Sequence, residues 1–139
     1  MNSRSWTLDP RLERDTATLG DLPLCRALVM KDANYPWLIL VPRRPDMVEI
    51  IDLDRSDQAA LMLEIERAAR ALKAVTTCDK LNVAALGNTV PQLHVHVIAR
   101  FKDDAAGARP VWGVVPPKAY DDAELERFAT AMRRAIGLD

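Results

Sequence analysis

The sequence predicts an α+β fold, with a mostly antiparallel sheet, one long central helix and a C-terminal helix. Apolar runs come in local pairs joined by short, turn-rich connectors, as antiparallel strands do. Only one long helical pattern separates these runs, whereas a parallel sheet needs a crossover between successive strands. With 139 residues, of which 49% are hydrophobic and 28% charged, we expect residues 1–139 to form a single domain.

The first two strands are expected at residues 24–30 and 37–43. Both runs are apolar and partly β-branched or aromatic, and the turn-rich segment KDANYP lies between them. Pro42 and Pro45 end the second strand, because proline cannot donate to a ladder of hydrogen bonds. The two runs therefore predict an antiparallel pair.

The clearest helix is expected from about Ser56 to Val75. Either Asp54 or Ser56 can cap its first turn. Apolar residues recur at helical spacing and form one stripe, which consists of Leu61, Ile65, Ala68, Leu72 and Val75. This helix should pack that stripe against the sheet.

The second half of the chain predicts two more strands and a last helix. The strands are expected at residues 80–86 and 92–100, with the loop GNTVP near their junction. Residues 103–120 are rich in Gly and Pro and predict an extended loop. A helix should follow Asp121, which can cap it with Glu124 three positions on, and Gly137 should end it.

The strand at 92–100 holds both histidines of the chain, His94 and His96. Alternate residues of a strand face the same side, so Gln92 and the two imidazoles should form a row, while the residues between them face the core. Leaving such groups buried without partners would cost about 1–3 kcal/mol each. The row therefore favours a ligand site over a purely structural role.

The loop before this strand supplies candidate anion ligands. Gly87 allows close approach of the backbone, and the side chains of Asn88 and Thr89 can donate hydrogen bonds to the oxygens of an anion. An ordinary turn is the alternative, because Gly-Asn is a common turn dipeptide. The position of the loop directly before the histidines makes phosphate binding an equally good interpretation.

A zinc site is a further alternative, because two histidines separated by one residue on a strand can bind one metal ion. The chain has no third histidine, so a carboxylate such as Asp32 or Asp103 would have to complete the set. We therefore expect no metal and no cofactor.

Charge and hydropathy narrow the classes of partner. The chain has 19 basic and 20 acidic residues, a balance that argues against binding long nucleic acid but permits a small anion. No run approaches the roughly 20 apolar residues of a membrane helix. The N-terminal segment MNSRSWTLDPRLERD lacks the apolar stretch of a signal peptide. We expect a cytoplasmic protein without membrane contact.

These motifs together carry a resemblance to a known family. QLHVHVI resembles the signature His-φ-His-φ-His-φ-φ of the histidine-triad (HIT) superfamily, with Gln92 in place of the first His. LNVAALGNTVP is similar to the strand and glycine loop that precede the triad, and YPWLILVPR to an earlier strand that ends at a proline. Order and spacing agree over residues 24–100, and Trp112 in PVWG resembles a tryptophan of some HIT branches.

The resemblance implies a HIT-like domain, often a homodimer, that hydrolyses or transfers a nucleotidyl group. Its substrates would be nucleoside 5′-monophosphate conjugates of the dinucleoside polyphosphate or phosphoramidate type. His94 matches the nucleophile, which attacks the α-phosphorus and forms a nucleotidyl-histidine intermediate. His96 would bind a phosphate oxygen and share in proton transfer to the leaving group.

The same resemblance assigns the remaining ligands of the nucleotide. Asn88 and Thr89 match positions that contact the phosphate, and Gly87 permits its approach. Asn82 is a further candidate for the phosphate site, and Asp32 is a candidate acceptor for a ribose hydroxyl.

Two departures from the family pattern bear on catalysis. Gln92 cannot titrate near neutral pH, although its amide can donate to a phosphate or orient a neighbour. Trp37 stands where several HIT branches carry another His, so a second imidazole is absent. Each lost charge-assisted contact is worth about 1.5–3 kcal/mol. A HIT-fold protein that binds a nucleotide without turning it over is therefore the alternative.

Overall fold

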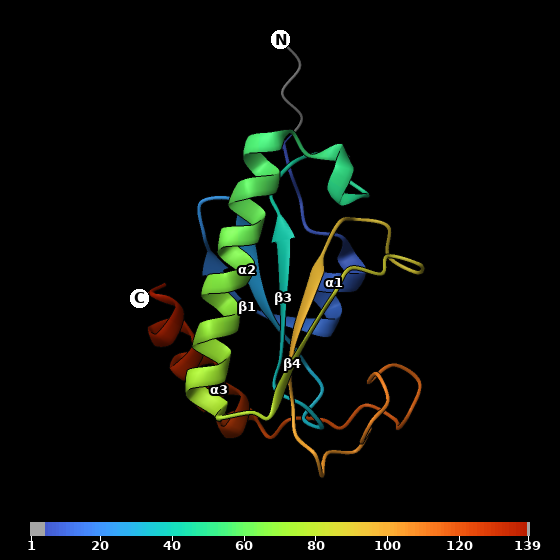
Figure 1. Ribbon diagram of the computed structural model, residues 1–139, viewed down its shortest axis with the longest axis vertical. Coiled ribbons are helices and arrows are strands. Elements are labelled where there is room, and N and C mark those ends of the chain that lie inside the picture. The colour runs from blue at the N-terminus through green and yellow to red at the C-terminus, as the bar shows by residue number, and fades with distance from the viewer. Residues whose placement is uncertain (1–4, 139) are drawn as a thin grey trace.

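The computed structural model describes residues 5–138 and confirms the α+β class. A five-stranded antiparallel sheet has the order β1-β2-β3-β5-β4, and α2 crosses one of its faces (Figure 1). The helices are α1 (Pro10–Asp15), α2 (Arg55–Thr76) and α3 (Asp122–Ile136), with a short 3₁₀ turn η1 (Ile50–Asp52) before α2. The strands are β1 (Thr16–Asp21), β2 (Cys25–Met30), β3 (Trp37–Pro42), β4 (Lys80–Ala84) and β5 (Val95–Arg100).

Strand alternation divides the sheet into two apolar faces. On β5, Val95, Val97 and Ala99 point into the main core, which lies against α2 and α3. His96 and Ile98 point to the opposite face, where Ile98 joins a smaller cluster with residues of α1 and of the loop after β5. The histidine face is therefore the one that α2 does not cover.

The long helix confirms most of the predicted pattern. The side chain of Asp54 caps α2 by accepting from the backbone N–H of Asp57. Leu61, Ala68 and Leu72 are buried in the main core, as expected. Val75 does not continue the buried stripe: this residue is exposed near the end of the helix.

The last helix also matches its prediction. Asp121 caps α3 by accepting from the N–H groups of Ala123 and Glu124. Gly137 ends the helix with φ 89°, in the left-handed region that glycine adopts without strain. Residues 103–120 form turns and extended chain, and this loop reaches back over the histidine face.

Two elements at the N-terminal end had not been predicted. The segment TATLGD forms the edge strand β1, which pairs with β2 around an irregularity between Thr18 and Gly20. The six residues of α1 follow a cap by Asp9, with Pro10 in the first turn. The alternation of β1 is weak and α1 is short, so neither has a strong local pattern.

Strand boundaries differ from prediction where the site begins. β4 ends at Ala84 rather than at residue 86, and β5 begins at Val95 rather than at residue 92. Pairing of β5 with β3 starts at Leu40 opposite Val95. Gln92 and His94 therefore lie in irregular chain before the strand, where side chains need not alternate.

Candidate functional site

A pocket of about 340 Å³ lies on the histidine face of the sheet. It brings together His94, His96 and the loop that contains Gly87, Asn88 and Thr89. Its other walls come from α1, from β2 and β3, and from the loops before and after β5. The residues are Leu12, Asp15, Met30, Ile39, Leu86, Val90 and Trp112. Five of the predicted site residues therefore share one cavity.

A backbone hydrogen bond sets the orientation of His94. Its Nδ1 lies 2.6 Å from the carbonyl oxygen of Gln92, and the side chain is only 7% exposed. Because a carbonyl oxygen can only accept, Nδ1 carries the proton of this bond. In the neutral ring Nε2 then holds the lone pair, which is the form that a nucleophilic imidazole requires.

Trp37 holds His96 in the opposite tautomer, with the proton of the neutral ring on Nε2. The indole Nε1 donates to Nδ1 of His96 at 3.0 Å. An indole nitrogen has no acceptor capacity, so Nδ1 of His96 is unprotonated and the proton of the neutral ring lies on Nε2. Trp37, which the sequence indicated only as the loss of an imidazole, thus fixes the tautomer of its neighbour.

Burial keeps His96 neutral. The side chain is 4% exposed, and burial, together with the nearby ring of His94, lowers the pKa of His96 to about 3. The centroids of the two imidazoles lie 4.9 Å apart in an edge-on arrangement. His96 therefore offers an N–H donor without a positive charge at neutral pH, beside the lone pair that the neutral ring of His94 carries.

Two tryptophan rings pack against His96. The ring of Trp112 stands edge-on to His96 at 5.0 Å and to Trp37 at 5.8 Å. Trp112 borders the pocket and remains partly exposed. These rings shield one side of His96 from water and strengthen the hydrogen bond that Trp37 makes to it.

The predicted anion loop has the expected position. Gly87 has φ 72°, a left-handed conformation that allows the chain to turn over the pocket. Arg11 from α1 fastens the loop by donating from Nη1 to the carbonyl oxygen of Thr89 at 3.0 Å. Asn88 and Thr89 border the cavity beside the histidines.

Gln92 does not join the predicted row. Its Oε1 accepts from the backbone N–H of Asp9 at 2.8 Å, and its Nε2 donates to the carbonyl oxygen of Thr7 at 2.9 Å. Both ends of the amide therefore bind the segment that leads into α1. The prediction failed because Gln92 precedes the paired part of β5, so strand alternation does not direct its side chain.

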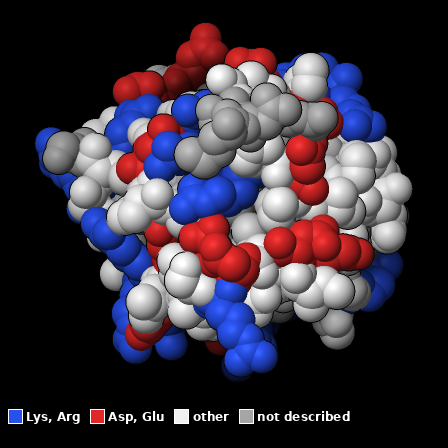
Figure 2. Space-filling view, turned by 90° about the horizontal axis from the view of Figure 1, so that it is seen from above, with Lys and Arg blue, Asp and Glu red and all other residues white. Residues whose placement is uncertain are grey.

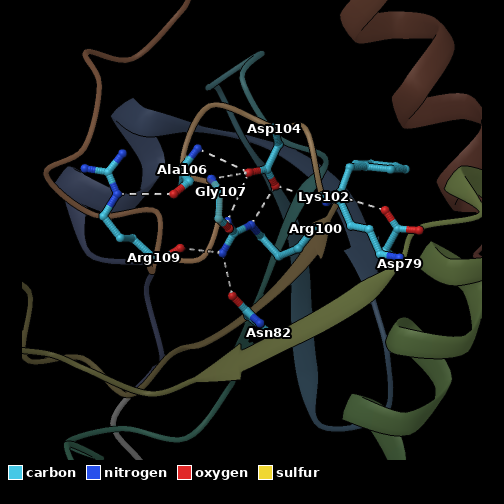
Figure 3. A network of polar contacts seen from close by, with 9 residues as sticks. Asp79, Asn82, Arg100, Lys102, Asp104, Ala106, Gly107 and Arg109 are labelled. Carbon is cyan, nitrogen blue, oxygen red and sulfur yellow. Dashed lines mark hydrogen bonds and ion pairs between the residues drawn. The ribbon is translucent and has the colours of Figure 1, made fainter.

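Asn82 is also used elsewhere. It lies on the same face of the sheet as His96. Asn82 pairs with Ile98 and lies two residues before Ala84, which is the β4 residue that pairs with His96. Figure 3 shows its Oδ1 accepting from Arg100, whose guanidinium also binds Asp104 and the carbonyl oxygens of Gly107 and Arg109. Asn82 thus helps to fix the loop after β5, and it does not border the histidine pocket.

Asp32 lies in a neighbouring hollow of about 470 Å³, which shares Asp15, Met30 and Trp112 with the histidine pocket. Its Oδ1 accepts from the backbone N–H and the side-chain amide of Asn34 and from the N–H of Lys118. Three internal donors therefore occupy this oxygen, and Asp32 lies outside the cavity that holds the histidines.

The zinc alternative gains no support from this geometry. Asp32 is held by Asn34 and Lys118, away from the histidine pocket. Within residues 5–138, no three His, Cys, Asp or Glu side chains form a group that could hold a metal ion.

Comparison with known proteins decides the family. The model of the HIT domain matches residues 11–103. The crystal structure of a histidine triad protein from Bradyrhizobium japonicum is 64% identical, with a TM-score of 0.94 over 96% of this chain and 99% of that chain. The chain belongs to the HIT family.

Two further histidine triad structures agree with this HIT assignment. One, from Sinorhizobium meliloti 1021, is 45% identical, with a TM-score of 0.91 over 94% of this chain and 96% of that chain. The other, from Marinobacter aquaeolei VT8, is 38% identical, with a TM-score of 0.94 over 97% and 98%. A search of the curated proteins gives no significant match.

HIT domains generally bind nucleotides, and the family includes hydrolases and transferases. In this HIT protein His94 and His96 are imidazoles in defined tautomers, whereas the amide of Gln92 is bound to the N-terminal segment. The wall residues Leu12 and Asp15 had not been predicted, because α1 carries no motif of its own. Among the described residues, no helix is long and apolar enough to cross a membrane.

Proposed function

We propose that the protein cleaves nucleoside 5′-monophosphate conjugates through a nucleotidyl-histidine intermediate on His94. The observation that carries this proposal is the 2.6 Å contact from Nδ1 of His94 to the carbonyl oxygen of Gln92, at the edge of a pocket with an anion loop. This contact leaves the lone pair on Nε2. Imidazole in this form is a competent nucleophile toward phosphorus at neutral pH.

The reaction has two steps. Nε2 of His94 forms a bond to the α-phosphorus while the bond from phosphorus to the leaving group breaks, and the leaving atom keeps that electron pair. Water then attacks phosphorus, the bond to Nε2 breaks, and a nucleoside monophosphate is released. Over the two steps one water is consumed, supplying a proton to the leaving group and a hydroxyl to phosphorus.

His96 stabilises the charge on the phosphate in this proposal. Its Nε2–H donates to a phosphate oxygen, because Trp37 occupies Nδ1. With a pKa of about 3, His96 is neutral at neutral pH and acts as a neutral hydrogen-bond donor to the phosphate. Gly87, Asn88 and Thr89 complete the anion cradle.

Turnover of a fluorogenic adenosine 5′-phosphoramidate tests the proposal. We expect His94→Ala to lower kcat by at least about a thousandfold, since no other group can form the intermediate. Mass spectrometry of the rapidly quenched wild-type protein should detect the nucleotidyl adduct. Equal turnover in the variant would exclude His94 as the nucleophile.

A nucleotide-binding protein without catalysis is the second candidate, and the position of Gln92 favours it. Its amide is committed to Thr7 and Asp9 and supplies nothing to the reacting atoms. Calorimetry with AMP beside the turnover assay separates the candidates: tight binding without turnover supports the second.

A small nucleotide suits the charge distribution better than a polymer does. Figure 2 shows Lys and Arg interspersed with Asp and Glu at the end of the molecule where α2 begins, without a broad basic face in that view. The formal net charge is −1. Long nucleic acid requires an extended positive surface.

A homodimer is part of the same proposal. β4 is the outer strand of the sheet beside β5, and Val83 on it is exposed. The outer edge of a sheet is a template for pairing with a second chain. Sedimentation at micromolar concentration should give the mass of two chains, and a monomer would contradict the expectation.

A further inference from the structure

Arg100, the last residue of β5, carries a guanidinium that the following loop encloses. Its side chain is 8% exposed, and its Nε lies 2.7 Å from Oδ2 of Asp104, whose side chain is 6% exposed. The guanidinium makes five hydrogen bonds, which equals its number of N–H donors. Two go to Asp104, and the others go to Oδ1 of Asn82 and to the carbonyl oxygens of Gly107 and Arg109 (Figure 3). All the donors of this buried cation are therefore committed within the protein.

Asp104 folds the same loop around the ion pair. Besides its two bonds from Arg100, its carboxylate accepts from the backbone N–H groups of Phe101, Ala106 and Gly107. These charge-assisted bonds can all form only when the loop takes one conformation. Because the pair is buried, removal of either partner leaves a charge without compensation. One ion pair therefore fixes the first part of the loop.

The fixed loop leads directly to Trp112, which packs on His96. Trp112 follows Arg109 by three positions, and Val111 before it is buried in the small cluster that also contains Trp37. The centroid of the Trp112 ring lies 5.0 Å from that of His96 and 5.8 Å from that of Trp37. The place where the chain leaves the ion pair therefore sets the position of a ring that shields His96 from water.

Arg100 also supports the second tryptophan that contacts His96. The guanidinium carbon lies 5.8 Å from the centre of the Tyr35 ring, within the range of a cation–π contact. Tyr35 is buried and stands edge-on to Trp37, with 6.3 Å between the ring centroids. Trp37 is the donor to Nδ1 of His96. Both tryptophans that hold His96 are therefore connected to the Arg100 ion pair by short chains of contacts.

Resting on the proposed function, we propose that Arg100 and Asp104 are positioning residues for His96, which act by holding Trp112 against its ring. With Trp112 in place, His96 is shielded from water and presents its Nε2–H to the phosphate. Without the ion pair the loop moves, and water reaches the imidazole. The cost of burying a charged ring then falls, so His96 takes up a proton more readily.

Few titratable groups face His96. Among the described residues that border the histidine pocket, the others are His94, whose ring centroid is 4.9 Å away, and Asp15 from α1. The residues of the other neighbouring elements that contact His96, Trp37 and Trp112, do not titrate as acids or bases in water. A change in the titration of His96 on loss of the ion pair therefore reports the shielding of this ring.

An NMR titration of the imidazole signals tests the proposal, because the chain has only two histidines. The variant is Asp104→Asn, which removes the charge and one acceptor oxygen but keeps the size of the side chain. In the wild-type protein the His96 signals should stay at their neutral positions down to about pH 5, whereas in the variant their midpoint should rise by at least about one pH unit toward the ordinary value of about 6.5. The spectrum of His94→Ala identifies the His96 signals. An identical titration of His96 in the wild-type and Asp104→Asn proteins would overturn the proposal.

Glu64→Gln is the matched control, because Glu64 is a second buried carboxylate that accepts from backbone N–H groups. It belongs to α2, is 6% exposed and binds the N–H groups of Leu24 and Cys25 at 2.8 Å in the main core. This control should lose stability and keep the wild-type titration of His96. Thermal unfolding of both variants establishes that they are folded during the titration. An equal shift in Glu64→Gln would show that any loosening of the fold has this effect, and the proposal would be wrong.

A double-mutant cycle tests whether the ion pair acts through Trp112. We expect Asp104→Asn to lower kcat for adenosine 5′-phosphoramidate by about ten- to a hundredfold, since small displacements of groups at a reacting centre have effects of this size. In a Trp112→Ala background the same substitution should change kcat by less than about twofold, because the ring that the loop positions is gone. Equal factors in the two backgrounds would contradict a role through Trp112.

Asn82→Ala is a gentler variant for the case in which Asp104→Asn does not fold. It removes one of the five bonds of Arg100 and leaves the ion pair intact, so it should shift the titration of His96 in the same direction by a smaller amount. An unchanged titration in folded Asn82→Ala would then overturn the proposal. If the wild-type protein does not turn over the phosphoramidate, the proposed function fails, whereas the NMR titration still decides whether the ion pair positions His96.

Discussion

Trp37 determines what His96 can do. The indole donates to Nδ1 of His96 at 3.0 Å, and its ring lies edge-on to the imidazole with centroids 5.6 Å apart. Because the indole nitrogen cannot accept, this contact selects one tautomer and resists protonation of Nδ1. Trp37 is thus a hydrogen-bond donor to His96 that does not itself titrate.

Trp37→Phe removes this donor and keeps an aromatic ring. We expect the free energy of unfolding to fall by about 1–3 kcal/mol, because Nδ1 of His96 is left buried without a partner. The kcat should also fall, since His96 can then adopt the tautomer that points a lone pair at the phosphate. Urea unfolding and turnover measure the two effects.

Trp6→Phe is the matched control for Trp37→Phe. Trp6 is partly buried, but its Nε1 has no hydrogen-bond partner in the structure, so this change removes ring atoms and no hydrogen bond. The control should leave kcat near the wild-type value. Equal effects of the two substitutions on kcat would show that the hydrogen bond to His96 has no role.

At the scale of elements, Gln92 joins the N-terminal segment to the histidine site. The amide binds Thr7 and Asp9, Arg11 binds the loop at Thr89, and Leu12 of α1 forms part of the pocket wall. α1 has only six residues and is too short to be stable alone. These tertiary contacts therefore hold one wall of the pocket in place.

Gln92→Ala should loosen that wall without moving His94, whose partner is the backbone of residue 92. We expect faster amide exchange in residues 9–13, excluding Pro10, and a loss of about 1–2 kcal/mol in stability from two broken hydrogen bonds. Hydrogen–deuterium exchange with peptide resolution measures the first effect. Gln58→Ala, which removes a side-chain bond to Leu53 at the start of α2, is the control and should leave residues 9–13 unchanged.

Local patterns predicted the elements and residues whose partners are near in sequence. β2 and β3 follow from apolar runs joined by a turn-rich segment, and α2 and α3 from periodicity and caps. Gly87, Asn88 and Thr89 lie beside the histidines because they precede them closely in the chain. Gln92, Asn82 and Asp32 bind Thr7, Arg100 and Lys118, which lie 18 to 86 positions away in the sequence. No local pattern specifies which distant group will take up a polar side chain.

For the molecule as a whole, the histidine site makes stability depend on pH. His96 packs between the sheet and the aromatic rings, and its pKa is about 3 in the folded protein against about 6.5 in an unfolded chain. Below pH 6.5 the unfolded state therefore binds a proton that the folded state excludes. Stability is lost progressively as the pH falls from 6.5 toward 3.

His96→Asn isolates this effect, since an amide oxygen can accept from Nε1 of Trp37 but has no proton to gain in this range. Between pH 6.5 and 4.5, we expect the wild-type free energy of unfolding to fall by up to about 1.4 kcal/mol per pH unit more than that of the variant. Carboxylates such as Asp104, whose pKa the Arg100 guanidinium lowers to about 2, stay ionised in the folded protein over this range. Urea unfolding of both proteins at several pH values measures the difference. Parallel curves would show that His96 accepts a proton as readily in the folded protein as in the unfolded chain, and that the neutral donor assigned to it is wrong.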